Sequence, residues 1–148
     1  MIGIIVDEIV NSPQNYFLFK TLNELSKSHD CYLFTSGIKE LPIENKFSIM
    51  QQLEALHHPG ILISTTMLNA QIAANSLTAT KKYYYIWNFE WTMLNQFAFH
   101  QLDKIFYNDD VELIANSSTH NHLLTQLFKS PIGIVYNWDR KSLEKVIL

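Results

Sequence analysis

Short apolar runs divide this chain, and each run stops at polar or small residues. The first run, Ile2–Val6, is followed directly by Asp7 and Glu8. A continuous apolar run of this length is typical of a strand that is buried on both faces, as strands of parallel sheets are. Similar apolar or aromatic runs predict further strands at residues 31–35, 47–50, 60–64, 82–87, 104–107, 112–115 and 132–135.

Segments with helical periodicity lie between these runs. Ser12 and Pro13 are predicted to be the N-cap and first residue of a helix, because proline is tolerated where the backbone N–H is unpaired anyway. Leu18, Leu22 and Leu25 then recur on one helical face. Further helices are predicted at residues 51–57, 68–77, 92–102 and 118–128.

The helix predicted at residues 68–77 has Leu68, Ile72 and Leu77 as its apolar residues. Strand and helix patterns alternate along the chain. This alternation predicts an α/β fold of the Rossmann-like type, with an open, mostly parallel sheet and helices on both faces.

Composition places the chain among folded proteins. Of its 148 residues, 47% are apolar, which suits one domain with a sizeable core. The net charge is −3 and Arg140 is the only arginine, so a protein that reads DNA sequence is disfavoured.

No apolar run approaches the roughly 18 residues of a membrane span, and the start at Met1 lacks the features of a signal peptide. Because Cys31 is the only cysteine, we expect a reduced, cytoplasmic protein.

We expect one domain over residues 1–138 and a tail, predicted to be helical, over residues 139–148. The tail holds an apolar stripe at helical spacing, formed by Leu143, Val146, Ile147 and Leu148. A free terminus is usually frayed and polar, so this stripe is expected to be covered by its own domain or by another subunit. We expect a homo- or hetero-oligomer in which the tail or Trp138 lies at or beside the contact.

Five segments together resemble one known protein family in their order and spacing. They are Ile4–Glu8, His29–Ser36, Tyr84–Glu90, Ala115–Ser117 and Val135–Asp139. The family is that of sugar-nucleotide-dependent glycosyltransferases of the two-Rossmann (GT-B) type. In their N-terminal half, a strand ending in Ala-Asn-Ser leads into a helix, and a strand ending in Tyr-Asn leads to the second half. The chain resembles this acceptor-side half, of the family 4-like kind, over nearly its whole length.

The resemblance implies an acceptor-side domain that needs a separate donor-binding half for sugar transfer from a sugar nucleotide. The partner would be a second polypeptide carrying that half, or the chain would form a homo-oligomer. The sugar nucleotide would be shared with the partner subunit, and neither a covalently bound cofactor nor a metal is expected. The acceptor would be a small molecule or a glycan, and a lipid-linked sugar or a protein also stays open. The charge disfavours a nucleic-acid partner, although a modified base stays open as an acceptor.

The first loop departs from the family pattern. Many members carry a Gly-Gly pair there, which lets the backbone approach the sugar nucleotide, whereas Asn11–Asn15 contains no glycine and includes a proline. This departure favours a second hypothesis, a non-catalytic binding protein that sequesters a nucleotide-type ligand or grips a protein partner. Asp7, Glu90 and the polar residues at the strand ends favour the enzyme.

Three carboxylates are candidate catalytic residues: Asp7, Glu8 and Glu90. Ligands of open α/β sheets bind at the carboxyl ends of the strands, and Asp7 and Glu8 follow the first strand. A carboxylate at this position would act as the base for an acceptor hydroxyl. The alternative is that Asp7 and Glu8 end the apolar run and face water.

Asn88 and Trp91, together with Glu90, would bind a ring-shaped ligand at the end of the aromatic strand, with Trp91 stacking on it. The alternative is that Trp91 belongs to the core. The turn Asn116–Ser118 would offer a helix N-terminus to an anion, or only cap the helix. Apart from Asn88 and Trp91, the candidate ligand-binding residues lie in loops or at strand ends: Asn11, Ser12, Asn15, Thr65, Thr66, Asn116, Ser117, Ser118 and Asn137.

Two histidine pairs invite a metal-site interpretation, His57 with His58 and His120 with His122. Residues one or two apart on a helix do not share a face as i, i+4 pairs do, and no thiolate cluster accompanies them. We therefore predict no zinc site. Cys31 lies in a predicted buried strand and is assigned to packing.

Overall fold

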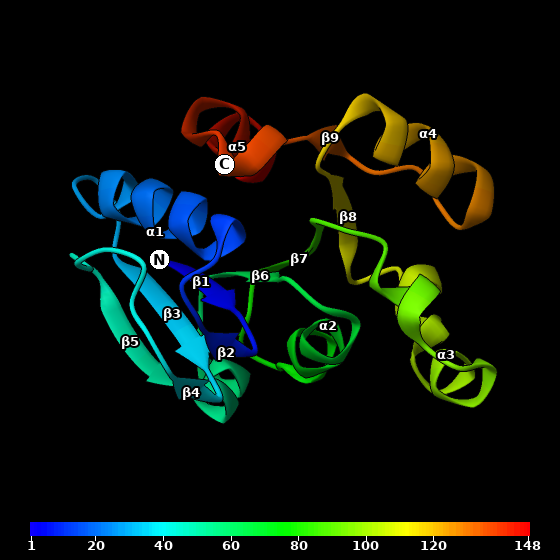
Figure 1. The fold of residues 1–148 in the computed structure, drawn as a ribbon, viewed down its shortest axis with the longest axis horizontal. Helices are drawn as coiled ribbons and strands as arrows, with labels where there is room; N and C mark the ends of the chain where they lie inside the picture. The colour runs from blue at the N-terminus through cyan, green and yellow to red at the C-terminus, as the bar shows by residue number, and fades with distance from the viewer.

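Seven parallel strands form one sheet at the centre of a computed structural model that describes all 148 residues. Their order across the sheet is β5-β3-β1-β6-β7-β8-β9 (Figure 1). The strands are β1 (Ile2–Ile5), β3 (Cys31–Thr35), β5 (Ser48–Gln51), β6 (Ile61–Ser64), β7 (Lys81–Ile86), β8 (Glu112–Ala115) and β9 (Gly133–Ile134). A separate two-stranded parallel sheet pairs β2 (Glu8–Ile9) with β4 (Gly37–Ile38).

Helices cover both faces of the large sheet, so the predicted α/β fold is confirmed. On one face lie α1 (Pro13–Leu25) and α5 (Arg140–Ile147), which are neighbours (Figure 1). The other face is covered by α2 (Met67–Asn75), α4 (Ser118–Leu127) and the segment that holds α3 (Gln96–Leu102). Four 3₁₀ helices complete the chain, η1 (Gln52–His57), η2 (Glu90–Met93), η3 (Asp103–Tyr107) and η4 (Tyr136–Trp138).

The strand order reverses direction beside β1. The chain first moves outward from β1 to β3 and β5, and then returns to place β6 on the other side of β1. At such a switch point the loops after neighbouring strands lead away to opposite faces, which opens a crevice at the carboxyl ends of the strands. The loops that follow β1 and β6 therefore border the position where a ligand of this fold is expected.

The strand predicted at residues 104–107 is wrong, because this segment forms η3. Ile105 and Phe106 are buried, but they pack between helices, with the Phe106 ring stacked on Phe128 at a centroid distance of 3.9 Å. The position beside β7 belongs to β8, so no sheet edge is left there for another strand. A run of four residues does not carry enough periodicity to separate a strand from a helical turn.

The apolar residues predicted for the helix over 68–77 are also partly wrong. Leu68 is 55% exposed and Leu77, which lies beyond the end of α2, is 97% exposed. The buried apolar residues of α2 are instead Met67, Ala70 and Ala73. The alanines fill little space, so α2 lies close against the sheet with small side chains rather than with leucines.

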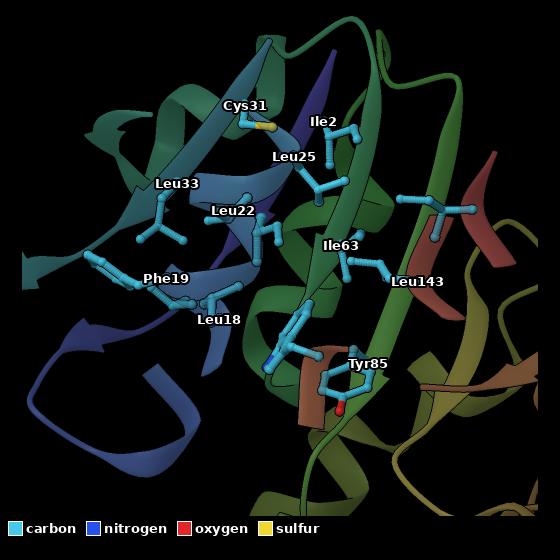
Figure 2. Packing of buried hydrophobic residues seen from close by; sticks show 14 of the residues in the cluster. Ile2, Leu18, Phe19, Leu22, Leu25, Cys31, Leu33, Ile63, Tyr85 and Leu143 are labelled. Atoms are coloured by element: carbon cyan, nitrogen blue, oxygen red, sulfur yellow. The ribbon is translucent and has the colours of Figure 1, made fainter. Parts of the chain in front are cut away.

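The C-terminal segment folds back onto α1. Leu143 and Ile147 of α5 and the ring of Trp138 are fully buried in the same cluster as Leu18 and Leu22. Figure 2 shows Leu143 in this cluster with side chains of α1 and of the central strands. The buried part of the tail's apolar stripe is thus covered by its own chain. None of the helices has the length and apolarity that crossing a bilayer requires.

Candidate functional site

Asp7 lies at the carboxyl end of β1, beside the switch point, and its side chain is exposed. Its Oδ1 accepts hydrogen bonds from Asn69 Nδ2 at 3.0 Å and from Thr66 Oγ1 at 3.4 Å. Thr66 is the N-cap of α2 and also accepts a hydrogen bond from the Asn69 backbone N–H. The first turn of α2 therefore orients the Asp7 carboxylate.

A second layer fixes this arrangement. Asn69 is fully buried, and its Oδ1 accepts a hydrogen bond from Gln52 Nε2 at 2.6 Å. The bond from Gln52 fixes the orientation of the Asn69 amide, so that its NH₂ group faces Asp7. The other carboxylate oxygen of Asp7, Oδ2, accepts no hydrogen bond from the chain. Asp7 thus has one anchored oxygen and one free oxygen, on an exposed side chain.

Glu90 is the second carboxylate at this edge, and it is half-buried. Its Oε1 accepts hydrogen bonds from the Tyr84 hydroxyl at 2.5 Å and from the Met67 backbone N–H. Met67 follows Thr66 directly, so Asp7 and Glu90 are bound to consecutive residues at the start of α2. Burial raises the pKa of Glu90, and the charge of Asp7 raises it further, while the two hydrogen bonds lower it.

An open groove at the ends of β3 and β5 adjoins the backbone of Asp7, whose side chain is not among the lining residues. Its volume is ≈ 730 Å³, and Glu54 is its only charged lining residue. Thr35 and Ser36 lie in its wall and donate hydrogen bonds to the Asp7 carbonyl, at 2.5 and 3.0 Å. The remaining lining residues are Gly37, Ile38, Ile49, Met50, Gln51, Gln52 and Leu53.

Sequence reasoning missed this groove and the supporting residues Gln52, Asn69 and Tyr84. The groove forms only when the segments at the ends of β3 and β5 lie side by side, and that depends on the parallel pairing of these strands, which the sequence pattern does not give. Asn69 lies inside a predicted helix, where nothing in the pattern marks it as buried. The one available signal was Thr66, because an N-cap at a strand end predicts that the next helical turn borders the site.

Glu8 takes no part in the hydrogen bonds that hold Asp7 and Glu90. It belongs to β2 and forms an exposed ion pair with Lys39, with a distance of 2.7 Å between Oε2 and Nζ. This contact fits the alternative interpretation of Glu8, as a water-facing residue that ends the apolar run. Of the three candidate carboxylates, only Asp7 and Glu90 share the start of α2.

The residues predicted from the first loop make structural contacts. Ser12 caps α1 by accepting a hydrogen bond from the Asn15 backbone N–H, and Asn15 is buried with its side chain donating to the Val10 carbonyl at 2.9 Å. Asn11 donates to Glu40 Oε1 at 3.3 Å. These bonds close the loop, so it presents few free polar groups to a ligand.

Thr65 has a similar structural role in the centre of the sheet. It is buried, and its hydroxyl donates to the Ile5 carbonyl at 2.9 Å, which joins the ends of β1 and β6. Its neighbour Thr66 is the one that reaches Asp7. Of the two predicted threonines, Thr66 therefore belongs to the site and Thr65 supports it.

A second polar cluster lies at the end of β8. Asn116 Oδ1 accepts hydrogen bonds from the Tyr85 hydroxyl at 2.8 Å and from the Asn137 backbone N–H at 2.9 Å, while Nδ2 donates to the Trp87 carbonyl at 3.4 Å. Ser117 is the N-cap of α4, and Ser118 is an exposed first-turn residue. The bond from the Asn137 N–H to Asn116 fixes the position of the segment that follows β9.

The Trp91 ring is half-buried and packs against an apolar cluster, which fits the alternative interpretation, while its stacking on a ligand stays a prediction. The ring packs edge-on against Phe106 and Phe128, at centroid distances of 5.3 and 5.5 Å, and belongs to the apolar cluster beneath α2. The aromatic residues of η3 and α4 converge on it, which the sequence could not show. Asn88 is exposed next to this cluster.

The remaining candidates carry no reactive or metal-binding arrangement. No three histidine, cysteine, aspartate or glutamate side chains come together as a metal-binding group. His58 is buried against Tyr32 and Phe34, and this burial lowers its pKa. Burial raises the pKa of Cys31 to about 11, so its thiol is protonated and unreactive near neutral pH.

No family model, curated protein or solved structure gives a significant match to this chain. The doubly wound fold is shared by proteins of many activities and does not select one of them. The functional argument therefore depends on the residues at the switch point.

Proposed function

We propose that this chain is the acceptor-side domain of a glycosyltransferase, which works with a separate half that binds the sugar nucleotide. The observation that carries the proposal is the Asp7 carboxylate, exposed at the switch point with one oxygen anchored by Asn69 and the other free. The sequence resemblance supports the same assignment, and the cytoplasm is the proposed location.

Asp7 is suited to the proton transfer that such a reaction requires. An acceptor hydroxyl would donate a hydrogen bond to Asp7 Oδ2 and attack the anomeric carbon of the donor sugar. As the new carbon–oxygen bond forms, the bond from the anomeric carbon to the phosphate oxygen breaks and the nucleoside diphosphate leaves. The hydroxyl proton passes to Asp7, which acts as general base.

The groove beside Asp7 suits an uncharged acceptor. Its lining has aliphatic side chains such as Ile38 and Leu53 and neutral polar groups such as Gln51 and Gln52, but no basic side chain. Such a mixture binds a hydroxylated molecule with an apolar face. The phosphates of the donor find no cation in this groove and are assigned to the partner half.

The test begins with purification of the full chain from its native source under mild conditions. We expect a protein with a sugar-nucleotide-binding domain to co-purify, and the complex to transfer radiolabelled sugar from a sugar-nucleotide mixture. Asp7→Asn should lower the transfer rate by about 100-fold or more, the usual range for loss of a general base. Asp109→Asn, an exposed control distant from the site, should leave the rate unchanged.

A complex that transfers sugar equally well with Asp7→Asn would remove Asp7 from the mechanism while leaving the enzyme assignment intact. A chain that transfers nothing with any co-purifying protein, yet binds a nucleotide alone, would support the binding-protein hypothesis. One observation favours that hypothesis: the glycine-free first loop is closed by its own hydrogen bonds and by the pairing of β2 with β4.

A further inference from the structure

A second groove lies between α1 and the C-terminal segment, and it shares no lining residue with the groove beside Asp7. Its volume is ≈ 750 Å³, within the usual range of ligand sites. One wall is a single face of α1, and the other is η4 with the first turns of α5, two helices that Figure 1 shows as neighbours. The lining residues are Phe17, Lys20, Thr21, Glu24, Tyr136, Asn137, Trp138, Asp139, Arg140, Lys141 and Glu144.

An unusual backbone shapes this groove. Asn137 and Trp138 both have left-handed backbone angles, with φ of 46° and 60°, and these are the only non-glycine residues with positive φ in the chain. Asn116 holds the Asn137 N–H at 2.9 Å, and Thr21 Oγ1 donates to the Trp138 carbonyl at 2.6 Å. Strained residues persist only where their surroundings fix them in this way, and they concentrate at functional sites.

The strained turn separates two aromatic side chains. It turns the Trp138 ring inward against Tyr85, at a centroid distance of 4.2 Å, and leaves Tyr136 64% exposed at the groove. The buried Trp138 Nε1 has no hydrogen-bond partner, so this backbone conformation also leaves a buried polar group unsatisfied, which is unfavourable for folding. Phe17, half-buried in the α1 wall, adds a second aromatic surface.

The charges of the groove cancel. Three basic residues line it and three acidic ones, so an ion of either sign gains little net attraction. Arg140 is already bound to Glu144, with Nε and Nη2 each 3.1 Å from Oε1. Lys20, Lys141 and Glu24 form no ion pair, so both donors and acceptors remain available.

We propose that this groove binds a neutral glycan, with a sugar ring lying against Tyr136 and its hydroxyls bonded to Lys20, Lys141 and Glu24. The apolar face of a sugar ring matches an exposed aromatic side chain, and its many hydroxyls match a balanced set of donors and acceptors. This binding is separate from the proposed transfer at Asp7, and it would operate in a protein that transfers nothing.

The test is binding of the full chain to a printed array that carries neutral oligosaccharides, sialylated or sulfated oligosaccharides, and nucleotides. We expect the chain to be retained on neutral oligosaccharides. Titration calorimetry then measures the affinity of the chain for the oligosaccharide that binds most strongly. Tyr136→Ala should weaken that binding at least tenfold. Tyr107→Ala is the matched control, because Tyr107 is 61% exposed and lies outside the groove.

Circular dichroism of both variants should match the parent chain, since both side chains are largely exposed. Retention on charged ligands alone, or on nothing in the array, would overturn the proposal. Equal weakening by Tyr136→Ala and Tyr107→Ala would also overturn it, because the binding would then not depend on this groove. Sugar transfer plays no part in any of these readouts, so they are independent of the Asp7 experiment.

Discussion

Asp7 and Asn116 each follow a buried strand at the same edge of the sheet, yet the chain uses them differently. The side-chain oxygen and nitrogen of Asn116 both form hydrogen bonds within the chain, with partners that include Tyr85 and the backbone of Asn137. Asp7 is anchored through one oxygen only and is exposed. A polar residue at a strand end is thus a site candidate only if the finished fold leaves part of its hydrogen-bonding capacity free.

The largest expected effect concerns the turn that Asn116 supports. Trp138→Ala should lower the free energy of unfolding by about 3–5 kcal/mol, the usual cost of removing a large buried aromatic side chain. Urea denaturation followed by circular dichroism measures it. Tyr136→Ala, which changes the exposed neighbour, should stay within about 0.5 kcal/mol of the parent. A loss for Trp138→Ala as small as that of its neighbour would mean that the cluster beneath α5 is loosely packed.

Asn116→Ala tests the structural member of the pair directly. We expect a loss of about 1–3 kcal/mol in the free energy of unfolding, because the Asn137 N–H loses its partner and the Trp87 carbonyl also loses a donor. The Tyr85 hydroxyl keeps its bond to the Val135 carbonyl at 2.8 Å, which limits the damage. The same urea titration applies, with Asn88→Ala, an exposed strand-end residue, as the control.

Glu90 is expected to have an effect between those of Asn116 and Asp7, and it is recognised by the pH dependence of the free energy of unfolding. Burial raises its pKa above the ordinary value of 4.5, so above that pH the folded state holds the proton more tightly than the unfolded state does. Its contribution to stability is therefore present at low pH and is lost as pH rises through the raised pKa. Glu90→Gln removes this loss.

The stability of Glu90→Gln relative to the parent should accordingly increase between a pH of about 4 and a pH of about 7. Urea titrations at several pH values in that interval measure the difference. Asp109→Asn, at an exposed position, serves as the control. A constant difference between Glu90→Gln and the parent would show that Glu90 titrates alike in the folded and unfolded chains.

The smallest expected effect on stability is that of Asp7→Asn. The new amide can keep its oxygen toward Asn69, so the free energy of unfolding should change by no more than about 0.5 kcal/mol. Differential scanning calorimetry beside Asn116→Ala makes the comparison in one experiment. If the two variants were equally destabilised, Asp7 would be a structural residue like Asn116, and the contrast between them would fail.

Much of the fold was predictable because buried parallel strands carry a strong local signal. The runs that became β1, β3 and β8 are mostly apolar, and the caps Ser12 and Ser117 mark the helices α1 and α4. The run at residues 104–107 carried the same signal but found no free sheet edge. Strand pairing is a property of the whole sheet, so a short segment alone cannot determine it.

The candidate site was predictable only in part. Asp7 was found from its place after a strand, but its anchoring by Asn69 and Gln52 depends on α2 and η1, which meet only in the folded chain. The surroundings of Trp91 were hidden for the same reason, because Phe106 and Phe128, which come later in the chain, pack against its half-buried ring. Sequence patterns place residues along an edge of the sheet, whereas packing decides which of them remain available.

The bond between Thr21 and the Trp138 carbonyl also constrains the order in which the protein can fold during synthesis. Its two residues are 117 positions apart, so at a translation rate of about 5–20 residues per second α1 exists for roughly 6–23 seconds before its partner segment is made. Throughout that interval the side of α1 that meets Trp138 and α5 is open to other nascent chains. Aggregation is therefore a greater hazard while the chain is being made than after it has closed.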